Sequence, residues 1–306
     1  MKINDRYELV KKLEDCGIYN LLQAKDETEK FYYIKAVKEE FSAKTEFIDS
    51  IKNRVSKINS LQIPLNQVKE TGEFERYFYL LEEYRDLRAL TGLSSKLKNE
   101  SVLTKIFLKI AEVLQKFHEG GVYFGLLSTE YIKVTQSLDV YFQDNFLDIS
   151  DFDYLKHLSN TLTNRRIIFI SPEVLNLEKL TPRSDIYSLG MMLALFLTGK
   201  LPFQVHDFFE FGPKSAQGIS ESYRESIPEN WRDFISGMIS IEEKKRLSLD
   251  AVIRGLSQVT SGPVSVCEHH PEKIAVEFCS RCGKPLCFDC IKMIKDHPFC
   301  SDCSDT

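Results

Sequence analysis

Seven of the eight cysteines lie between Cys267 and Cys303, and this clustering constrains the C-terminal part of the chain strongly. It forms four ligand pairs in succession: Cys267-x2-His270, Cys279-x2-Cys282, Cys287-x2-Cys290 and Cys300-x2-Cys303. Eight such ligands suffice for two tetrahedral zinc sites, and the paired spacing without a secretory signal favours zinc over disulfides. About forty residues bury little apolar surface, so we expect two structural zinc ions to supply most of the stability.

The order of these pairs resembles the B-box zinc fingers, in which the pairs interleave. The resemblance implies one site made of Cys267, His270, Cys287 and Cys290, and another made of Cys279, Cys282, Cys300 and Cys303. B-boxes often end in histidines, whereas this chain ends in a CxxC pair, so His297 stays open as a substitute ligand. Protein ligands would fill all four corners of each site, and we therefore expect no metallohydrolase activity.

The rest of the composition describes a globular chain without a membrane segment. Its 306 residues, 43% of them apolar, allow one large and one small domain. The net charge of −5 argues against a general nucleic-acid binder. The charged N-terminus is unlike a signal peptide, and the longest apolar run, 189–197, is far shorter than the roughly 20 residues that span a bilayer. These features predict a cytoplasmic protein.

The hydrophobic pattern predicts an α+β fold with two lobes. We expect short strands within residues 1–35, a strand at 75–84 and a strand pair at 132–143. Apolar residues at helical spacing predict helices around 47–61 and 102–117, and the chain is helical in character after Pro172. The small, polar segment 257–266 contains a Gly-Pro pair and predicts a linker before the cysteine-rich module at 267–303.

Three segments of the second half resemble protein kinases. They are IIFISPEVL at 167–175, TPRSDIYSLGMMLALFLTGKLPF at 181–203 and EEKKRLSLDAVI at 242–253. The resemblance covers about residues 5–256 and implies a kinase-like domain at 1–256, with an N-lobe to about residue 85 and a C-lobe from about 86. It also implies scaffold roles: Glu173 and Arg246 form a buried ion pair, and Asp185 orients the backbone of the catalytic loop.

The phosphate-binding positions depart from the kinase pattern. The three glycines of the glycine-rich loop correspond to Glu14, Cys16 and Tyr19, and only Gly17 remains between them. Glycine lets backbone N–H groups approach phosphate without interference from a Cβ, so we expect an ordinary hairpin here.

Lys35, in FYYIKAV, matches the strand lysine that contacts phosphates in kinases. The helix glutamate that should hold this lysine falls near Arg54, a like charge. Glu46 lies about two turns too early. On this alignment no carboxylate holds Lys35 in its catalytic position.

The catalytic loop aligns with 122–134, where Tyr123, Phe124 and Gly125 occupy the HRD positions. The base aspartate is therefore absent, and Leu127 replaces the loop lysine. Glu130 occupies the place of the metal-binding asparagine and stays open as a ligand for Mg²⁺. The metal-binding DFG motif has two candidates: Asp144 by position, which the spacing favours, and Asp151 by letters.

The sequence thus predicts a catalytically impaired, pseudokinase-type signalling or scaffolding protein whose zinc module binds protein partners. The alternative is a divergent but active ATP-dependent serine/threonine kinase, or another nucleotide-dependent transferase. It would use Mg²⁺ with Lys35, Glu130 and either Asp144 or Asp151. Nucleic-acid binding through the zinc module is a weaker hypothesis, because its basic residues are mixed with many acids.

Overall fold

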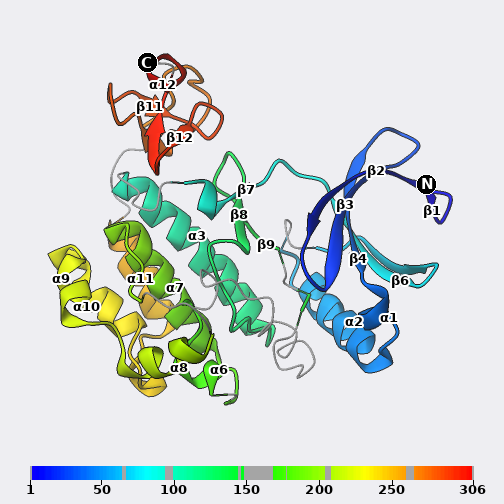
Figure 1. Cartoon of the computed structure of the whole chain (residues 1–306), viewed down its shortest axis with the longest axis horizontal. Helices are drawn as coiled ribbons and strands as arrows, with labels where there is room; N and C mark the ends of the chain where they lie inside the picture. Colours follow the sequence, from blue (N-terminus) through cyan, green and yellow to red (C-terminus); the bar gives the residue numbers. More distant parts are fainter. Residues whose placement is uncertain are drawn as a thin grey trace. The chain divides into compact units, whose positions relative to one another are not determined.

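The computed structural model describes residues 2–63, 67–93, 99–143, 146–147, 168–176, 178–203, 208–259 and 265–304. Contacts divide the chain into two compact units. Unit 1 comprises Met1–Asp86 with Asp144–Thr161, and unit 2 comprises Leu87–Gln143 with Leu162–Thr306. Each unit has its own core, and each is described in turn (Figure 1).

Unit 1 is built on an antiparallel six-stranded sheet with the order β1-β2-β3-β4-β6-β5. The strands are β1 (Lys2–Ile3), β2 (Tyr7–Asp15), β3 (Tyr19–Lys25), β4 (Phe31–Val37), β5 (Glu70–Phe74) and β6 (Tyr77–Glu83). Sequence patterning located the strands within 1–35 and at 75–84, but not β5. The sequence of β5, ETGEF, has few apolar residues and therefore lacks the usual strand signal.

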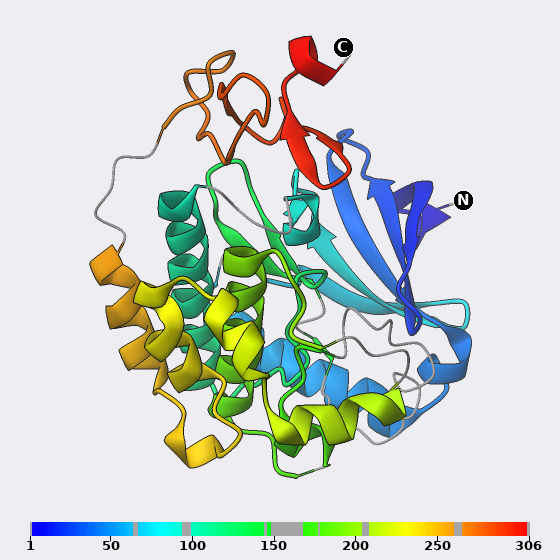
Figure 2. The same cartoon turned by 60° about the vertical axis from the view of Figure 1, so that its left-hand side comes forward.

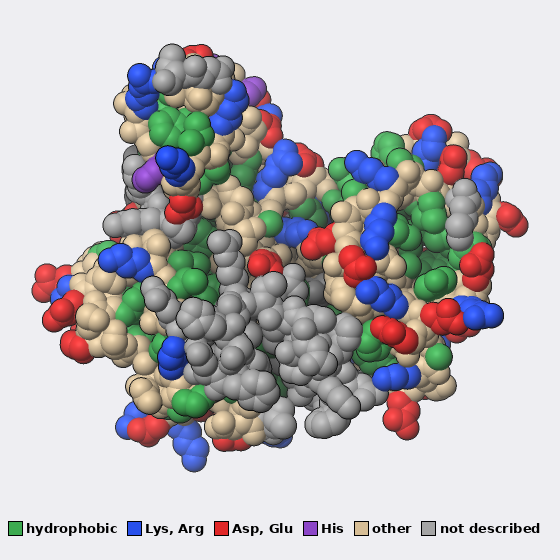
Figure 3. Space-filling model, viewed as in Figure 1, with side chains coloured by type: hydrophobic (Ala, Val, Ile, Leu, Met, Phe, Trp, Pro, Cys, Tyr) green, Lys and Arg blue, Asp and Glu red, His purple; other side chains and the backbone are tan. Residues whose placement is uncertain are grey.

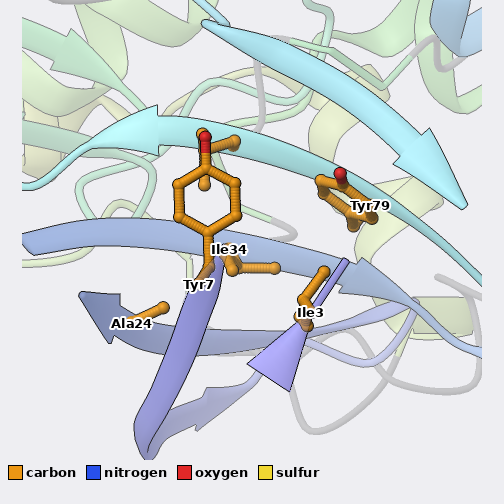
Figure 4. Close-up of a cluster of buried hydrophobic side chains, with 6 residues drawn as sticks. Ile3, Tyr7, Ala24, Ile34 and Tyr79 are labelled. Carbon is orange, nitrogen blue, oxygen red and sulfur yellow. The ribbon is translucent and has the colours of Figure 1, made fainter. Parts of the chain in front are cut away.

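The two faces of this sheet carry different side chains because successive residues of a strand point in opposite directions. One face holds a hydrophobic cluster (Figure 4), whose buried members are Ile3, Tyr7, Ala24, Ile34, Tyr79 and Leu81. Lys35 follows Ile34, and Glu82 follows Leu81, so both project from the opposite face. That face is the one relevant to nucleotide chemistry in a kinase-like fold.

Two helices, α1 (Glu39–Ser42) and α2 (Thr45–Ser60), lie between β4 and β5 in the chain. In α2 the predicted stripe is buried at Phe47, Ile51, Val55 and Ile58. Leu61, the last residue of the expected stripe, is the half-buried C-cap residue. Helical periodicity therefore identified this helix, and its end lies one residue earlier than the stripe.

Unit 2 is mainly helical (Figures 1 and 2). Its helical elements are η2 (Leu90–Gly92), α3 (Glu100–Glu119), α6 (Pro172–Leu175), α7 (Pro182–Thr198), α8 (Phe208–Gln217), α9 (Glu221–Ser226), α10 (Glu229–Met238), η3 (Glu243–Lys245) and α11 (Leu249–Val259). Helix α3 begins where the Asn99 side chain accepts a hydrogen bond from Val102 N. Helix α7 begins with a Thr181 capping box and ends at Gly199, whose φ of 71° suits glycine. Both helices bury long apolar faces and form the core of the unit.

A small sheet in unit 2 has the order β7 (Arg88–Ala89), β8 (Ile132–Val134) and β9 (Val140–Phe142). Strands β8 and β9 form the expected hairpin at 132–143. Among the described residues, no helix is long and apolar enough to span a membrane.

The C-terminal module also belongs to unit 2 by its contacts. It contains the hairpins β10 (Glu277–Phe278) with β11 (Pro285–Leu286) and β12 (Lys292–Ile294) with β13 (His297–Phe299), followed by α12 (Ser301–Ser304). The expected linker 257–266 is shorter than predicted at both ends. Helix α11 continues to Val259, and Val266 already forms a bridge with Ile274 inside the module.

Contacts at three places join this module to the rest of unit 2. The Asn99 side chain donates to Ala275 O at 3.3 Å. Asp289 accepts hydrogen bonds from Arg88 at 3.1 Å and from Gln136 at 2.9 Å. Asp289 lies between Cys287 and Cys290, so the loop that carries one cysteine pair also contacts the rest of unit 2.

Candidate functional site

The scaffold residues of the kinase-like region meet inside unit 2. The guanidinium of Arg246 forms two parallel hydrogen bonds to the Glu173 carboxylate, each 2.7 Å long. Both residues are buried, and the Ser184 hydroxyl donates to Glu173 at 2.8 Å. Burial alone would raise the pKa of Glu173, but the Arg246 hydrogen bonds and charge lower it below its usual value. The result is a satisfied internal ion pair without access to a substrate.

Asp185, at the start of α7, holds the backbone of the loop after α3. Its carboxylate accepts from Gly125 N at 2.6 Å and from Phe124 N at 3.0 and 3.2 Å. The same carboxylate lies 2.8 Å from His118 Nε2. Asp185 is fully buried, so these bonds define the conformation of the loop.

The loop held in this way lacks reactive side chains at its centre. Gly125 is buried and has a φ of 69°, a left-handed conformation that glycine adopts without strain. Phe124 stacks on Phe142, with ring centroids 5.0 Å apart and planes inclined by 22°. Leu127 is also buried. Aromatic and aliphatic packing therefore occupies positions that carry charge in the kinase motif.

The remaining expected ligands for Mg²⁺ are only partly described. Glu130 is half-buried in unit 2, two residues before β8. Both DFG candidates, Asp144 and Asp151, lie outside the described residues. Phe146, the third residue of the Asp144-Asn145-Phe146 triplet, is described and fully buried in unit 1.

The turn between β2 and β3 uses its own backbone N–H groups internally. Gly17 N donates to the Asp15 carboxylate at 3.0 Å, Cys16 N to Tyr19 O at 3.0 Å, and Ile18 N to Cys16 O at 3.0 Å. The Lys38 ammonium, first, and then the Gly17 N–H lower the pKa of Asp15 to about 2. A carboxylate thus occupies the end of the turn, where a phosphate-binding loop offers N–H groups to an anion.

Lys35 does have a carboxylate partner, which corrects the expectation that none would hold it. Its Nζ lies 2.7 Å from Glu82 Oε1, and the two side chains are only 1% and 4% exposed. Glu46 is exposed on α2, and Arg54 is buried in the same helix. The partner therefore comes from strand β6, because the sheet brings β4 and β6 together although the residues are 47 positions apart. Alignment to the kinase helix could not identify Glu82 as this partner. The sequence feature that pointed to it was an acidic residue at the end of the apolar run of β6.

The cysteine-rich module brings its eight ligands into two groups. One contains Cys267, His270, Cys287 and Cys290, and the other contains Cys279, Cys282, Cys300 and Cys303. In each group the ligand atoms lie within 4.8 Å of one another. These are the two interleaved sets named from the sequence. His269 and His297 are exposed and belong to neither group of described residues.

The spacing within each group matches zinc. Zn–S bonds of about 2.3 Å at tetrahedral angles separate two sulfurs by about 3.8 Å, and a sulfur from a nitrogen by about 3.6 Å. The structure has 3.7 Å between Cys267 and Cys290 Sγ and 3.7 Å between Cys282 and Cys300 Sγ. His270 Nδ1 lies 3.2 Å from Cys290 Sγ and 3.5 Å from Cys287 Sγ. The donor set therefore fits a four-coordinate cation in each group.

The acidity of the thiols favours the same chemistry. Burial opposes ionisation of Cys267 and Cys279, but backbone N–H groups directed at their sulfurs lower both pKa values to about 6. Burial and neighbouring sulfurs raise the pKa values of Cys290 and Cys303 to about 12. Repulsion among crowded thiolates opposes their ionisation, and a divalent cation between them would remove that opposition.

Comparison with known proteins agrees with the fold. The family model described as "Protein kinase domain" matches residues 17–255. The chain is 26% identical over 236 residues to "Probable serine/threonine-protein kinase PknB" of Lactococcus lactis, covering 73% of this chain and 35% of that protein. It is 22% identical over 248 residues to "Serine/threonine-protein kinase PrkC" of Bacillus subtilis, covering 76% of this chain and 37% of that protein.

The chain thus spans little more than a third of the length of these relatives. The match begins at Gly17, within the altered glycine-rich loop, and ends before the cysteine-rich module. Because the family model covers well over half of its residues, the chain belongs to the protein kinase domain family.

Proposed function

We propose that this chain is a pseudokinase-type signalling or scaffolding protein whose zinc module provides a binding surface for protein partners. The proposal depends most on the absence of a side chain at Gly125. On the sequence alignment Gly125 corresponds to the kinase base aspartate, and its backbone N–H donates to the Asp185 carboxylate. A glycine has no side chain to accept a proton from a substrate hydroxyl, and loss of a general base typically costs 10²–10⁴ in rate.

The neighbouring positions support the same proposal. Protein kinases use ATP with Mg²⁺, and they position it with loop N–H groups, a lysine and metal ligands. In unit 1 the N–H groups of Cys16, Gly17 and Ile18 are already bonded within the turn. In unit 2, Phe124 and Leu127 replace charged residues of the catalytic loop. The rate lost through poor positioning of ATP and the rate lost with the base would multiply.

We assign one structural zinc ion to each cysteine group. With three cysteines and a histidine in one group, and four cysteines in the other, all tetrahedral positions are supplied by the protein. Zinc would hold the loops of the module together and would leave no position for a reacting water. None of the eight cysteines forms a disulfide, which suits a reducing compartment such as the cytoplasm.

The surface of the module supports a role in protein binding. Met293 and Ile294 on β12 are 38% and 40% exposed, unusual for large apolar side chains on a short strand. Figure 3 shows hydrophobic side chains on the visible face of this module beside Lys and Arg side chains. The mixture of apolar and charged groups fits a protein partner.

A divergent active kinase is the second candidate, and one observation favours it. Lys35 is paired with a carboxylate, as the phosphate-binding lysine of a kinase must be, although the partner is Glu82. The names of the bacterial relatives point the same way. Such an enzyme would need another base in place of Gly125.

Phosphate transfer separates the two candidates. Purified protein is incubated with Mg²⁺ and γ-labelled ATP, alone and with a mixture of acceptor proteins, beside a Lys35→Met variant. We expect neither the wild-type chain nor the variant to produce more label than a mock purification. Label on the chain or an acceptor that disappears in Lys35→Met would establish the active kinase and overturn the proposal.

Zinc content tests the module. Elemental analysis of reduced protein should find about two zinc ions per chain, and about one after Cys287→Ser or Cys300→Ser. Cys16→Ser is the matched control, since Cys16 lies in unit 1 and should leave the content at two. A wild-type chain without zinc, or the same loss in all three variants, contradicts the assignment.

A further inference from the structure

We propose that Lys35 is a locked structural lysine and that the phosphate site of unit 1 is closed from within by Glu82, Phe146 and Tyr19. The inference deepens the proposed function, on which it rests, by stating why this chain does not present its lysine to a nucleotide. It draws only on contacts within unit 1.

The first part of the lock is a cross-strand ion pair. In the antiparallel pairing of β4 with β6, Tyr33 is opposite Glu82 and Lys35 is opposite Leu80. Lys35 and Glu82 are therefore diagonal neighbours on one face, a distance that two long side chains can bridge. Their 2.7 Å contact is set by the sheet register. In kinases the corresponding glutamate lies on a helix whose position regulates the pair. Here no helix movement would release the lysine.

The second part of the lock is an aromatic cover. Lys35 Nζ lies 4.7 Å from the centroid of the Phe146 ring, a cation–π distance. Phe146 packs edge-to-face on Tyr19, with centroids 5.4 Å apart and planes inclined by 68°. Both rings are fully buried. The ammonium thus faces a carboxylate and an aromatic ring, and its side chain is only 1% exposed.

The two rings occupy positions that the kinase motif keeps small. Tyr19 stands at the third glycine of the loop, and Phe146 is the third residue of the DFG candidate that starts at Asp144. A bulky ring at either place fills volume that glycine would leave open for phosphate. Substitutions at two distant sequence positions have therefore produced one packed contact around Lys35.

Opening this lock for a nucleotide is electrostatically unfavourable. Moving Lys35 towards a phosphate would leave the Glu82 carboxylate buried without its partner, which is strongly destabilising. If Glu82 kept its place, a phosphate would approach a buried negative charge. The pair is thus self-sufficient, and the lysine contributes to the interior of unit 1.

Chemical labelling of the wild-type chain tests the inference directly. The protein is treated with an amine-reactive acyl phosphate of ATP, and lysine modification is measured by mass spectrometry with and without excess Mg·ATP. We expect Lys35 to react at least about tenfold more slowly than Lys30, which is half exposed, because it reacts only after local opening. Preferential labelling of Lys35 that Mg·ATP suppresses would overturn the inference.

Thermal unfolding provides an independent test with a matched control. Lys35→Met should lower the melting temperature by about 10 °C without any nucleotide, because it removes the ammonium that lies 2.7 Å from the buried Glu82 carboxylate. Lys30→Met removes an exposed partner of Glu83, the residue after Glu82 in β6, and should change the melting temperature by about 1–2 °C. A Lys35→Met, Glu82→Leu double variant should recover most of the loss, because an apolar pair replaces a buried ion pair without an orphaned charge.

The outcomes separate this inference from the proposed function. If Lys35→Met is no more destabilising than Lys30→Met and abolishes a wild-type shift by Mg·ATP, the lysine is a nucleotide ligand and the lock is wrong, even without phosphate transfer. If phosphate transfer occurs and is unaffected by Lys35→Met, the pseudokinase proposal fails while the lock stands. If the single variant does not fold, recovery in the double variant and protection from labelling support the lock, and their absence refutes it.

Discussion

The kinase-like part of the chain and the cysteine-rich module depend on their reactive residues in opposite ways. In the kinase-like part, the buried Glu173–Arg246 pair and the helices around it form a core, and Gly125, which the sequence alignment assigns to the catalytic loop, has no reactive group. In the module, the described hydrophobic cluster is small and consists of Cys279, Leu286 and Cys300, so the ligands themselves are much of the core.

This difference explains why chemistry can be lost from one region and must be kept in the other. A catalytic aspartate on a loop contributes little to a large apolar core, so its replacement leaves the fold intact. A zinc ligand in a domain of about forty residues would be part of what stabilises the fold, so its replacement should destabilise the domain.

Removing metal should change stability more than any variant proposed below. It should unfold the module and leave the kinase-like part folded. Chelation should unfold the module, because structural zinc contributes about 10–16 kcal/mol in comparable domains. Trp231, the single tryptophan, is buried in α10 and bonded to Glu100 of α3, and its fluorescence should stay native. Circular dichroism follows the module in parallel. A simultaneous loss of both signals would mean that the module supports the helical core, contrary to the comparison.

Breaking the internal ion pair should have the next largest effect, confined to the kinase-like part. Arg246→Met leaves Glu173 buried and unpaired and should cost about 3–5 kcal/mol in the free energy of unfolding. Lys245→Met removes an exposed partner of Glu242 in the adjacent segment and should cost less than about 1 kcal/mol. Denaturant unfolding followed by Trp231 measures both, and zinc content should be unchanged in each variant.

Acid should weaken the same pair by a predictable route. The pKa of Glu173 in the folded chain is lowered, so its contribution is fully present above the ordinary glutamate pKa of about 4.5. The contribution is lost as the pH falls below that value and through the lowered folded pKa. The stability difference between wild type and Glu173→Gln should therefore shrink on acidification below about pH 4.5. A difference that stays constant would show that the ionised form of Glu173 is not the stabilising one.

The smallest effect should come from the contact between the regions at Asn99. Its side chain both caps α3 and donates to Ala275 O in the module. Asn99→Ala should cost about 1–2 kcal/mol through loss of the cap and of a buried hydrogen bond. Asn99→Ser retains a capping hydroxyl but loses the bond to Ala275 O, and it should cost less. The difference between the two variants therefore isolates the cap, and the loss that remains in Asn99→Ser reports the docking contact. Equal losses in the two variants would assign the whole effect to docking and none to the cap.

Much of the architecture followed from local pattern. Short runs of apolar residues located the strands at 75–84 and 132–143. Apolar spacing of period 3.6 located the helices α2 and α3, because burial of one helix face imposes that spacing. The weakly apolar strand β5 and the continuation of α11 to Val259 were not predicted. In both segments, polar residues that form hydrogen bonds with neighbouring groups interrupt the apolar pattern from which strands and helices are predicted.

The sequence by itself determined which residues carry chemistry: the eight cysteine and histidine ligands, Lys35, and the glycine at position 125. Residue type and short spacing express these features, since ligand pairs and turns are local. Only the tertiary structure decided which groups meet. It paired Lys35 with Glu82, set Phe146 against Tyr19, and joined Asp289 to Arg88. Such contacts depend on strand register and on packing between residues far apart in the chain, which local pattern does not encode.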